Sequence, residues 1–168
     1  MLTFDQQALT LVNHISDTDM LAVFAVWVLG LFAQRLGMVV YSIFALPGTV
    51  MHESAHYLMA LVFAARPTFP SIIPKKENNS WRLGSVNFVP TVLNVIPVSL
   101  APMLLMPTGI LYAATLLHNA QGLAYLAHAW VTGTVIRASM PSSQDWKVAF
   151  PVLSVATVLG LGIFFLTK

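Results

Sequence analysis

Long apolar stretches separated by short polar ones make up most of the chain. A helix needs about 20 apolar residues to cross the hydrocarbon core of a bilayer, and several of these stretches approach or exceed that length. The predicted membrane-spanning segments are residues 20–34, 38–65, 95–117, 122–136 and 148–166. We therefore expect an all-α polytopic membrane protein with about five transmembrane helices.

Two segments interrupt the apolar pattern and are expected to lie outside the bilayer core. Residues 1–19 mix apolar and polar side chains, which predicts an interfacial amphipathic helix on the membrane surface. Residues 66–92 form the only long polar stretch of the sequence and predict a small β-hairpin, with strands at 68–73 and 81–89 around a polar turn. The whole chain, residues 1–168, is expected to form a single membrane-embedded domain.

The chain can turn back after the first predicted span at either of two places. Gly37 follows Arg35, whose side chain can reach the membrane interface, and Pro47-Gly48 is a strong turn signal. A turn at Gly37 gives one helix over residues 38–65, in which Pro47 is a kink. We favour this arrangement, because it places the polar residues of that helix within reach of the loop that follows.

Composition supports a membrane protein and excludes several other classes. Hydrophobic residues make up 57% of the chain and charged residues only 8%, against about 25% charged residues in soluble domains. The net charge of +2 is too small, and too little clustered, to predict binding to nucleic acid. The chain has no cysteine, so any metal site must use histidine and carboxylate ligands.

The distribution of Lys and Arg predicts which side of the membrane faces the cytoplasm. The predicted crossings put the N-terminus, the hairpin and the loop at Asp145 on one side, opposite the turns at Arg35 and His118 and the C-terminus. The first side collects most of the basic residues, namely Arg66, Lys75, Lys76, Arg82, Arg137 and Lys147. By the positive-inside rule this side is cytoplasmic. The simplest host is the cytoplasmic membrane of a bacterium or an archaeon.

One segment carries three ionisable side chains between apolar flanks: His52-Glu53-Ser54-Ala55-His56. On a helix, His52 and His56 lie one above the other on the same face, so both imidazoles can bind one metal ion. Glu53 lies beside them and can accept a proton from a water molecule that the metal activates. Ionisable groups are costly within a membrane, so this segment predicts a zinc hydrolase site rather than a pair of buried structural histidines.

A zinc site of this kind needs another protein ligand, and the chain offers few. Asp145 is the only acid after the hairpin and begins a predicted helix, so it is either the ligand or a helix-capping carboxylate. His128, in the middle of a predicted span, is a second candidate ligand and could instead contact substrate, whereas His118 lies by a turn on the far side. Asn119 and Asn94 could stabilise an oxyanion, although the spacing selects neither.

These residues resemble the site-2 protease family of intramembrane zinc metalloproteases. The resemblance rests on the helix with His52-Glu53-Ser54-Ala55-His56, the hairpin after it, and Pro141-Ser142-Ser143-Gln144-Asp145 at the start of a late helix. It implies a Zn²⁺ ion held by His52, His56 and Asp145, with Glu53 as the catalytic residue. The implied activity is hydrolysis of peptide bonds in membrane-embedded or membrane-proximal substrates. The chain departs from the family pattern at Ala55, where glycine is usual.

The residues also allow a function of another class. The small size of the chain suits a non-proteolytic membrane subunit of a larger complex, in which the metal site is structural or vestigial. A protease would have the lipid bilayer, a peptide or membrane-protein substrate and accessory subunits as partners. The hairpin edge over residues 82–89 could then hold an unwound substrate by strand addition.

Overall fold

A computed structural model describes residues 14–77 and 80–167 of the chain. Its helices are α2 (Asp17–Arg35), α3 (Met38–Phe44), α4 (Leu46–Val62), α5 (Val95–Leu100), α6 (Leu105–Tyr112), α7 (Gly122–Ala138) and α8 (Ser143–Leu166). A 3₁₀ turn, Ala101–Leu104, joins α5 to α6, and a π-helical turn, Ala113–Leu117, extends α6. Strands β1 (Lys75–Glu77) and β2 (Ser80–Arg82) form an antiparallel hairpin. The prediction of a mostly helical chain with a small hairpin after the histidine-bearing helix is confirmed.

The predicted interfacial helix over residues 1–19 lies outside the described residues, apart from residues 14–19. Within that part, Ser16 caps a helix that begins at Asp17. The first predicted span therefore begins slightly earlier than its apolar pattern indicated.

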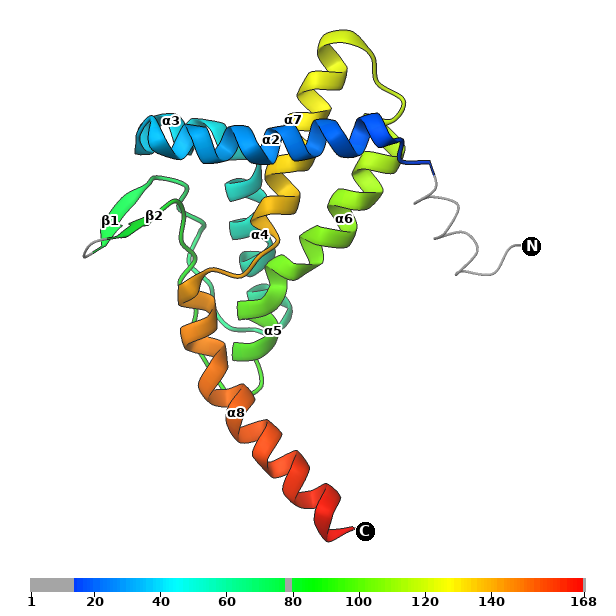
Figure 1. Ribbon diagram of the computed structural model, residues 1–168. Helices are drawn as coiled ribbons and strands as arrows, with labels where there is room; N and C mark the ends of the chain where they lie inside the picture. Colours follow the sequence, from blue (N-terminus) through cyan, green and yellow to red (C-terminus); the bar gives the residue numbers. More distant parts are fainter. Residues whose placement is uncertain (1–13, 78–79, 168) are drawn as a thin grey trace.

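Helix α7 lies at the centre of the described structure and packs against α2, α4 and α6 (Figure 1). Gly48, in the first turn of α4, allows that helix to approach α7 closely, because a Cβ atom there would overlap the carbonyl group of Thr134. One helical turn after Gly48 comes His52, and one turn after Thr134 comes Ala138. The crossing therefore brings the first histidine of the motif to the C-terminal end of α7.

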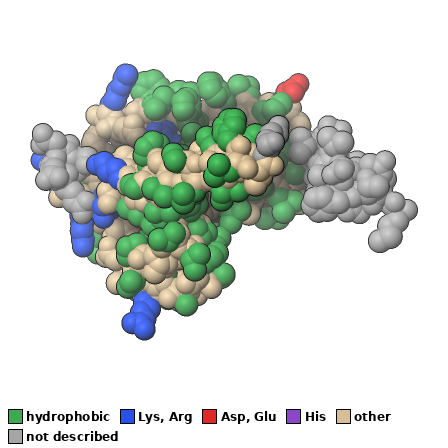
Figure 2. Space-filling model, turned by 90° about the horizontal axis from the view of Figure 1, so that it is seen from below, with side chains coloured by type: hydrophobic (Ala, Val, Ile, Leu, Met, Phe, Trp, Pro, Cys, Tyr) green, Lys and Arg blue, Asp and Glu red, His purple; other side chains and the backbone are tan. Residues whose placement is uncertain are grey.

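Three helical stretches are long and apolar enough to cross a membrane, namely Asp17–Arg35, Val95–Leu117 and Gly122–Leu166. The last of these contains both α7 and α8, which are separated by residues 139–142. The described residues thus offer fewer clear spans than the number predicted. Figure 2 shows apolar side chains over much of the surface seen from below, with Lys and Arg mainly on the side that carries the hairpin.

The predicted single helix over residues 38–65, kinked at Pro47, is instead two helices, because the chain bends at Ala45 between α3 and α4. Pro47 lies in the first turn of α4, where its missing N–H leaves no intrahelical hydrogen bond unmade. In the interior of a longer helix its ring would clash with the carbonyl group of Ile43. The proline therefore marks a helix start rather than a kink. As a result, α3 packs against α2, and α4 runs at an angle to both (Figure 1).

The hairpin is shifted along the sequence relative to its prediction. The regular strands pair Lys75 with Arg82, in a region that includes the predicted turn. The predicted strands are less regular: Ser71 and Ser85 exchange backbone hydrogen bonds of 2.9 and 2.8 Å, and their pairing is an isolated bridge. The two arms still run side by side, so the second arm has a defined edge facing away from the first.

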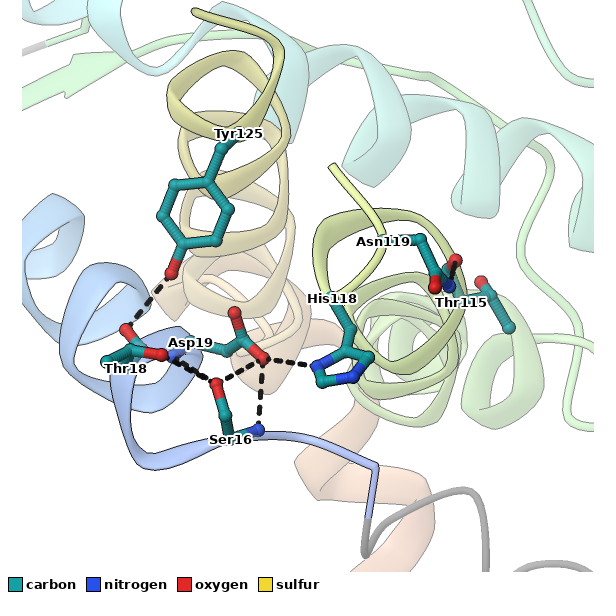
Figure 3. Close-up of polar contacts among 7 residues, drawn as sticks. All are labelled: Ser16, Thr18, Asp19, Thr115, His118, Asn119 and Tyr125. Atoms are coloured by element: carbon teal, nitrogen blue, oxygen red, sulfur yellow. Dashed lines mark hydrogen bonds and ion pairs between the residues drawn. The ribbon is translucent and has the colours of Figure 1, made fainter. Parts of the chain in front are cut away.

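A buried carboxylate joins the start of α2 to the segment after α6 (Figure 3). Asp19 accepts hydrogen bonds from the backbone N–H of Ser16 at 3.0 Å and from the Ser16 hydroxyl at 2.7 Å. Nδ1 of His118 lies 3.1 Å from the same carboxylate oxygen. On the neighbouring α7, the Tyr125 hydroxyl donates to the carbonyl oxygen of Thr18 at 3.1 Å. The first turn of α2, the end of the π-helical turn and the start of α7 therefore meet at one end of the molecule.

This contact overturns the predicted order of the crossings. The prediction put the start of the first span and the His118 turn on opposite sides, whereas Asp19 and His118 are in direct contact. Two contacts show that helices α2 and α7 run in the same direction. Near their starts, Thr18 of α2 lies by Tyr125 of α7. Further along both helices, the Arg137 guanidinium of α7 donates to the Trp27 carbonyl of α2 at 3.2 Å. The predicted topology placed these two segments antiparallel.

We expect Asp19→Ala to lower the free energy of unfolding by about 2 kcal/mol, since it removes a helix cap and leaves the donors of Ser16 and His118 without their acceptor. Thermal unfolding in detergent measures the effect. Asp17→Ala is the matched control, because Asp17 is exposed in the same helical turn and its loss should cost only about 0.5 kcal/mol. If the two variants lowered the free energy of unfolding equally, Asp19 would not stabilise the contact between the start of α2 and His118.

Candidate metal centre

Helix α4 presents His52 and His56 on one face, because side chains four residues apart lie one above the other. Their Nε2 atoms are 3.2 Å apart. Each Nδ1 atom lies at hydrogen-bond distance from a backbone carbonyl oxygen, 2.7 Å from Ala138 for His52 and 2.8 Å from Val98 for His56. A carbonyl oxygen only accepts hydrogen bonds, so each Nδ1 carries a proton. In the neutral form of the ring, this leaves a lone pair on Nε2.

Asp145 reaches the same point from the first turn of α8. The backbone N–H of Ser142 donates to Oδ2 of Asp145 at 2.6 Å, and the Asp145 N–H donates to the Ser142 hydroxyl at 3.3 Å, which forms a capping box. Oδ1 of Asp145 is 3.2 Å from Nε2 of His56, and Oδ2 is 3.6 Å from Nε2 of His52. The two roles considered for Asp145 are therefore compatible: the capping interaction orients a carboxylate that faces both histidines.

His52, His56 and Asp145 together form a group that could hold a metal ion. A protonated ring would donate from Nε2 to the Asp145 carboxylate. When both rings are neutral, two imidazole lone pairs and a carboxylate converge without a hydrogen-bond donor among the three ligand atoms. Such an arrangement is electrostatically unfavourable by itself, and a cation between the three groups stabilises it. The chemistry of the donor set thus fits a metal ion.

Glu53 is buried beside this group, with 6% of its surface exposed. The second arm of the hairpin passes directly against it at Gly84, where a Cβ atom would lie 2.6 Å from Cγ and 2.7 Å from Oε1 of Glu53. The missing side chain of glycine allows the backbone to lie this close. Gly84 therefore confines the Glu53 side chain next to the two histidines of the same helix.

His52, Glu53, His56 and Asp145 all line one cavity of about 480 Å³. Its walls come from the junction of α3 and α4, the hairpin arm over residues 81–88, the end of α7 and the start of α8. The apolar side chains in these walls include Phe44, Leu83, Val86 and Phe88, and the basic ones are Arg82, Arg137 and Lys147. A cavity of this size has room for a short segment of a peptide chain.

The structure places the other candidate residues elsewhere. His128 Nδ1 lies 2.7 Å from the hydroxyl of Tyr112, which joins α7 to α6. The Asn119 side chain donates to the carbonyl oxygen of Thr115 at 2.7 Å, near the end of α6 opposite to α5 (Figure 3). The described residues that line the cavity include none of the following: His128, Asn119, Asn94 and His118.

Several parts of the site carry no clear sequence signal. The carbonyl groups of Ala138 and Val98 orient the histidines, yet any residue has a carbonyl group, so nothing in the sequence selects these two. Gly84 has a weak signal, because an isolated glycine inside a strand pattern often marks a close approach of another group.

Comparisons of the chain with protein families, characterised proteins and solved structures found no match. The function of the chain is therefore inferred from the geometry and chemistry of the cavity.

Proposed function

We propose that the protein is an intramembrane zinc metalloprotease that hydrolyses peptide bonds of membrane-embedded or membrane-proximal substrates. The observation that carries this proposal is the convergence of His52, His56 and Asp145 beside Glu53 in one cavity. Two imidazoles, a carboxylate ligand and a separate glutamate are the groups that metal-assisted peptide hydrolysis needs. The apolar helices of membrane length support a location within the bilayer.

The spacing of the ligand atoms supports zinc. Ligands at about 2.0–2.2 Å from a tetrahedral zinc ion are separated from each other by roughly 3.3 Å. The two Nε2 atoms are 3.2 Å apart, close to that value. The nearest Asp145 oxygens lie at similar distances, Oδ1 at 3.2 Å from Nε2 of His56 and Oδ2 at 3.6 Å from Nε2 of His52. Two histidines and one carboxylate are a common protein ligand set of catalytic zinc, which keeps a further position open for the reaction.

Each residue of the site has a role in this proposal. When bound, zinc supplies Lewis acidity to the scissile carbonyl group and to the attacking water. The carbonyl groups of Ala138 and Val98 hold His52 and His56 in the orientation that directs both Nε2 atoms to the ion. Glu53 accepts the proton of the attacking water and passes it to the leaving amine. Its burial against Gly84 keeps the carboxyl group at a fixed position and away from bulk water.

The second arm of the hairpin is suited to bind substrate as an added strand. Ser85 bonds to Ser71 through both backbone groups, so its N–H and C=O face the first arm. In an extended strand the neighbouring residues Gly84 and Val86 direct their backbone groups to the opposite edge, and both residues line the cavity. A helical substrate has to unwind before hydrolysis, and the unwound segment can pair with this edge.

We expect Val86→Pro to lower kcat/KM for peptide cleavage about tenfold, because it removes a backbone N–H from the free edge of the strand. The hydrogen bonds between Ser71 and Ser85 are not altered by this change. Initial cleavage rates are compared with those of Val86→Ala, which shortens the side chain and keeps the N–H. Equal losses in the two variants, or no loss in Val86→Pro, would show that the edge does not pair with substrate.

The proposed location is a cytoplasmic membrane, with the site towards the cytoplasm. The basic residues Arg82, Arg137 and Lys147 line the cavity, and Lys75 and Lys76 belong to the adjacent hairpin. Clusters of Lys and Arg near membrane segments stay on the cytoplasmic side. The charge distribution therefore supports a cytoplasmic opening of the cavity, independently of the number of crossings.

Removal of zinc tests the proposed activity. We expect the purified protein to cleave members of a library of apolar transmembrane peptides, to stop when 1,10-phenanthroline removes the metal, and to resume when zinc is added back. Mass spectrometry identifies the cleaved bonds. A non-proteolytic subunit with a structural metal would instead cleave nothing, while its thermal stability would fall in chelator. If the chelator-treated protein contained no detectable zinc and still cleaved peptides, a metal-dependent mechanism would be refuted.

A further inference from the structure

Arg137, at the C-terminal end of α7, lines the same cavity and is held in place by groups from two other helices. Its Nη1 atom donates to the carbonyl oxygen of Trp27 in α2 at 3.2 Å. The guanidinium carbon lies 5.9 Å from the centre of the Trp27 ring and 5.6 Å from that of Tyr41 in α3. Contacts of this kind fix the orientation of the guanidinium group and leave several of its N–H donors available.

The partners of Arg137 are a backbone carbonyl and two aromatic rings, and none of them neutralises its charge. Among the carboxylates whose side chains the structure describes, namely Asp17, Asp19, Glu53 and Asp145, none lies within ion-pair distance of Arg137. Of the two acids that line the cavity, Asp145 faces the two histidines and Ser142, and Glu53 lies beside Gly84 of the hairpin arm. A fixed, half-buried cation without an anion next to a catalytic cavity indicates a site for an anionic group of a ligand.

We infer that Arg137 binds a carboxylate of the peptide substrate, so that the enzyme prefers substrates with an acidic side chain or a free C-terminus near the scissile bond. This inference rests on the proposed peptidase function. A carboxylate is the anion that unmodified peptides carry, and its two oxygens match the planar fork of the guanidinium group. Arg137 directly precedes Ala138, whose carbonyl group orients His52, so the specificity contact would lie close to the metal ligands.

Peptide binding to a Glu53→Gln background tests the inference without any dependence on turnover. The probes are fluorescein-labelled apolar peptides in pairs that differ only by Glu or Gln at one position, each made with a free and an amidated C-terminus. We expect the carboxylate-bearing member to bind about tenfold more tightly, and the added substitution Arg137→Gln to abolish the difference while binding of the neutral peptide is unchanged. The free and amidated series show which carboxylate is recognised.

Two further variants separate a specificity contact from a general effect of charge. Lys147→Gln removes another cation that lines the cavity and should leave the preference intact. Arg137→Lys keeps the charge without the planar fork and should weaken the preference. The zinc content of each variant is measured alongside, because loss of the preference together with zinc would show that Arg137 only supports the metal site, which would overturn the inference.

Other outcomes are equally decisive. A parent protein that binds both peptides of each pair alike, or a preference that survives in Arg137→Gln, would refute the inference. Arg137-dependent binding to phosphatidylglycerol vesicles over phosphatidylcholine vesicles, without a peptide preference, would identify a lipid phosphate as the ligand and refute it as well. If the preference depends on Arg137 but the zinc-loaded parent with Glu53 intact cleaves none of the peptides, the contact between Arg137 and a peptide carboxylate stands and the proposed peptidase function fails.

Discussion

A chain with His56 changed to alanine is expected to purify with almost no zinc, whereas the wild-type chain should hold about one ion. His56 supplies one of the converging ligand atoms, and its loss leaves a single imidazole and a carboxylate to hold the metal. We expect the dissociation constant for zinc to rise at least about a hundredfold, which exceeds the effect of losing a group that merely supports a ligand. Elemental analysis of detergent-purified protein after reconstitution with zinc measures the metal content.

Asp145 requires a more careful substitution, since it also caps α8. Asp145→Asn keeps an oxygen that accepts from the Ser142 N–H but lowers the negative charge at the metal, so it should lose zinc while α8 stays capped. His128→Ala is the matched control, because His128 bonds to Tyr112 and lies outside the cavity. If Asp145→Asn kept its zinc and His128→Ala lost it, His128 rather than Asp145 would be the ligand. A wild-type chain that never binds zinc would refute the proposed metal site.

The sequence indicated which side chains converge in the cavity better than it indicated what holds them. His52 and His56 follow from local geometry, because any helix places residues four apart on one face. Asp145 could be selected because the chain has so few acids, and the structure places it beside both histidines. Asp145 is oriented by the nearby Ser142, but the groups that orient the two histidines are backbone carbonyls of residues far away in sequence. Their positions depend on how the helices cross, which no local pattern records.

The fold shows the same division between local and long-range information. Apolar stretches indicated where helices occur, since a membrane helix needs only sufficient length and apolar character. Such helices are apolar on all sides, so the pattern does not tell which face packs or in which sense a helix runs. The contact between Asp19 and His118 joins residues that are 99 positions apart, and it excludes the predicted order of crossings. Pro47 was ambiguous for another reason, because a proline is compatible with both a kink and a helix start.

Glu53→Gln is expected to lower the rate of peptide cleavage by about a thousandfold while the protein keeps its zinc. Glutamine has nearly the shape of glutamate, so it should fit against Gly84 and leave His52 and His56 undisturbed. An amide cannot accept the proton of the attacking water at neutral pH, so the loss should appear in kcat rather than in zinc content or substrate affinity. Initial rates with zinc-loaded protein, together with metal analysis of the same samples, measure the two effects separately.

Ser54→Ala is the control for this experiment, since Ser54 is the next residue of α4 and is not among the residues that line the cavity in the described part of the chain. It should retain activity and zinc. Loss of zinc in Glu53→Gln would mean that the glutamate supports the metal site rather than the proton transfer. Full activity in Glu53→Gln would refute its role as the base, and another group in the cavity would then have to take the proton, because zinc alone does not move a proton to the leaving amine.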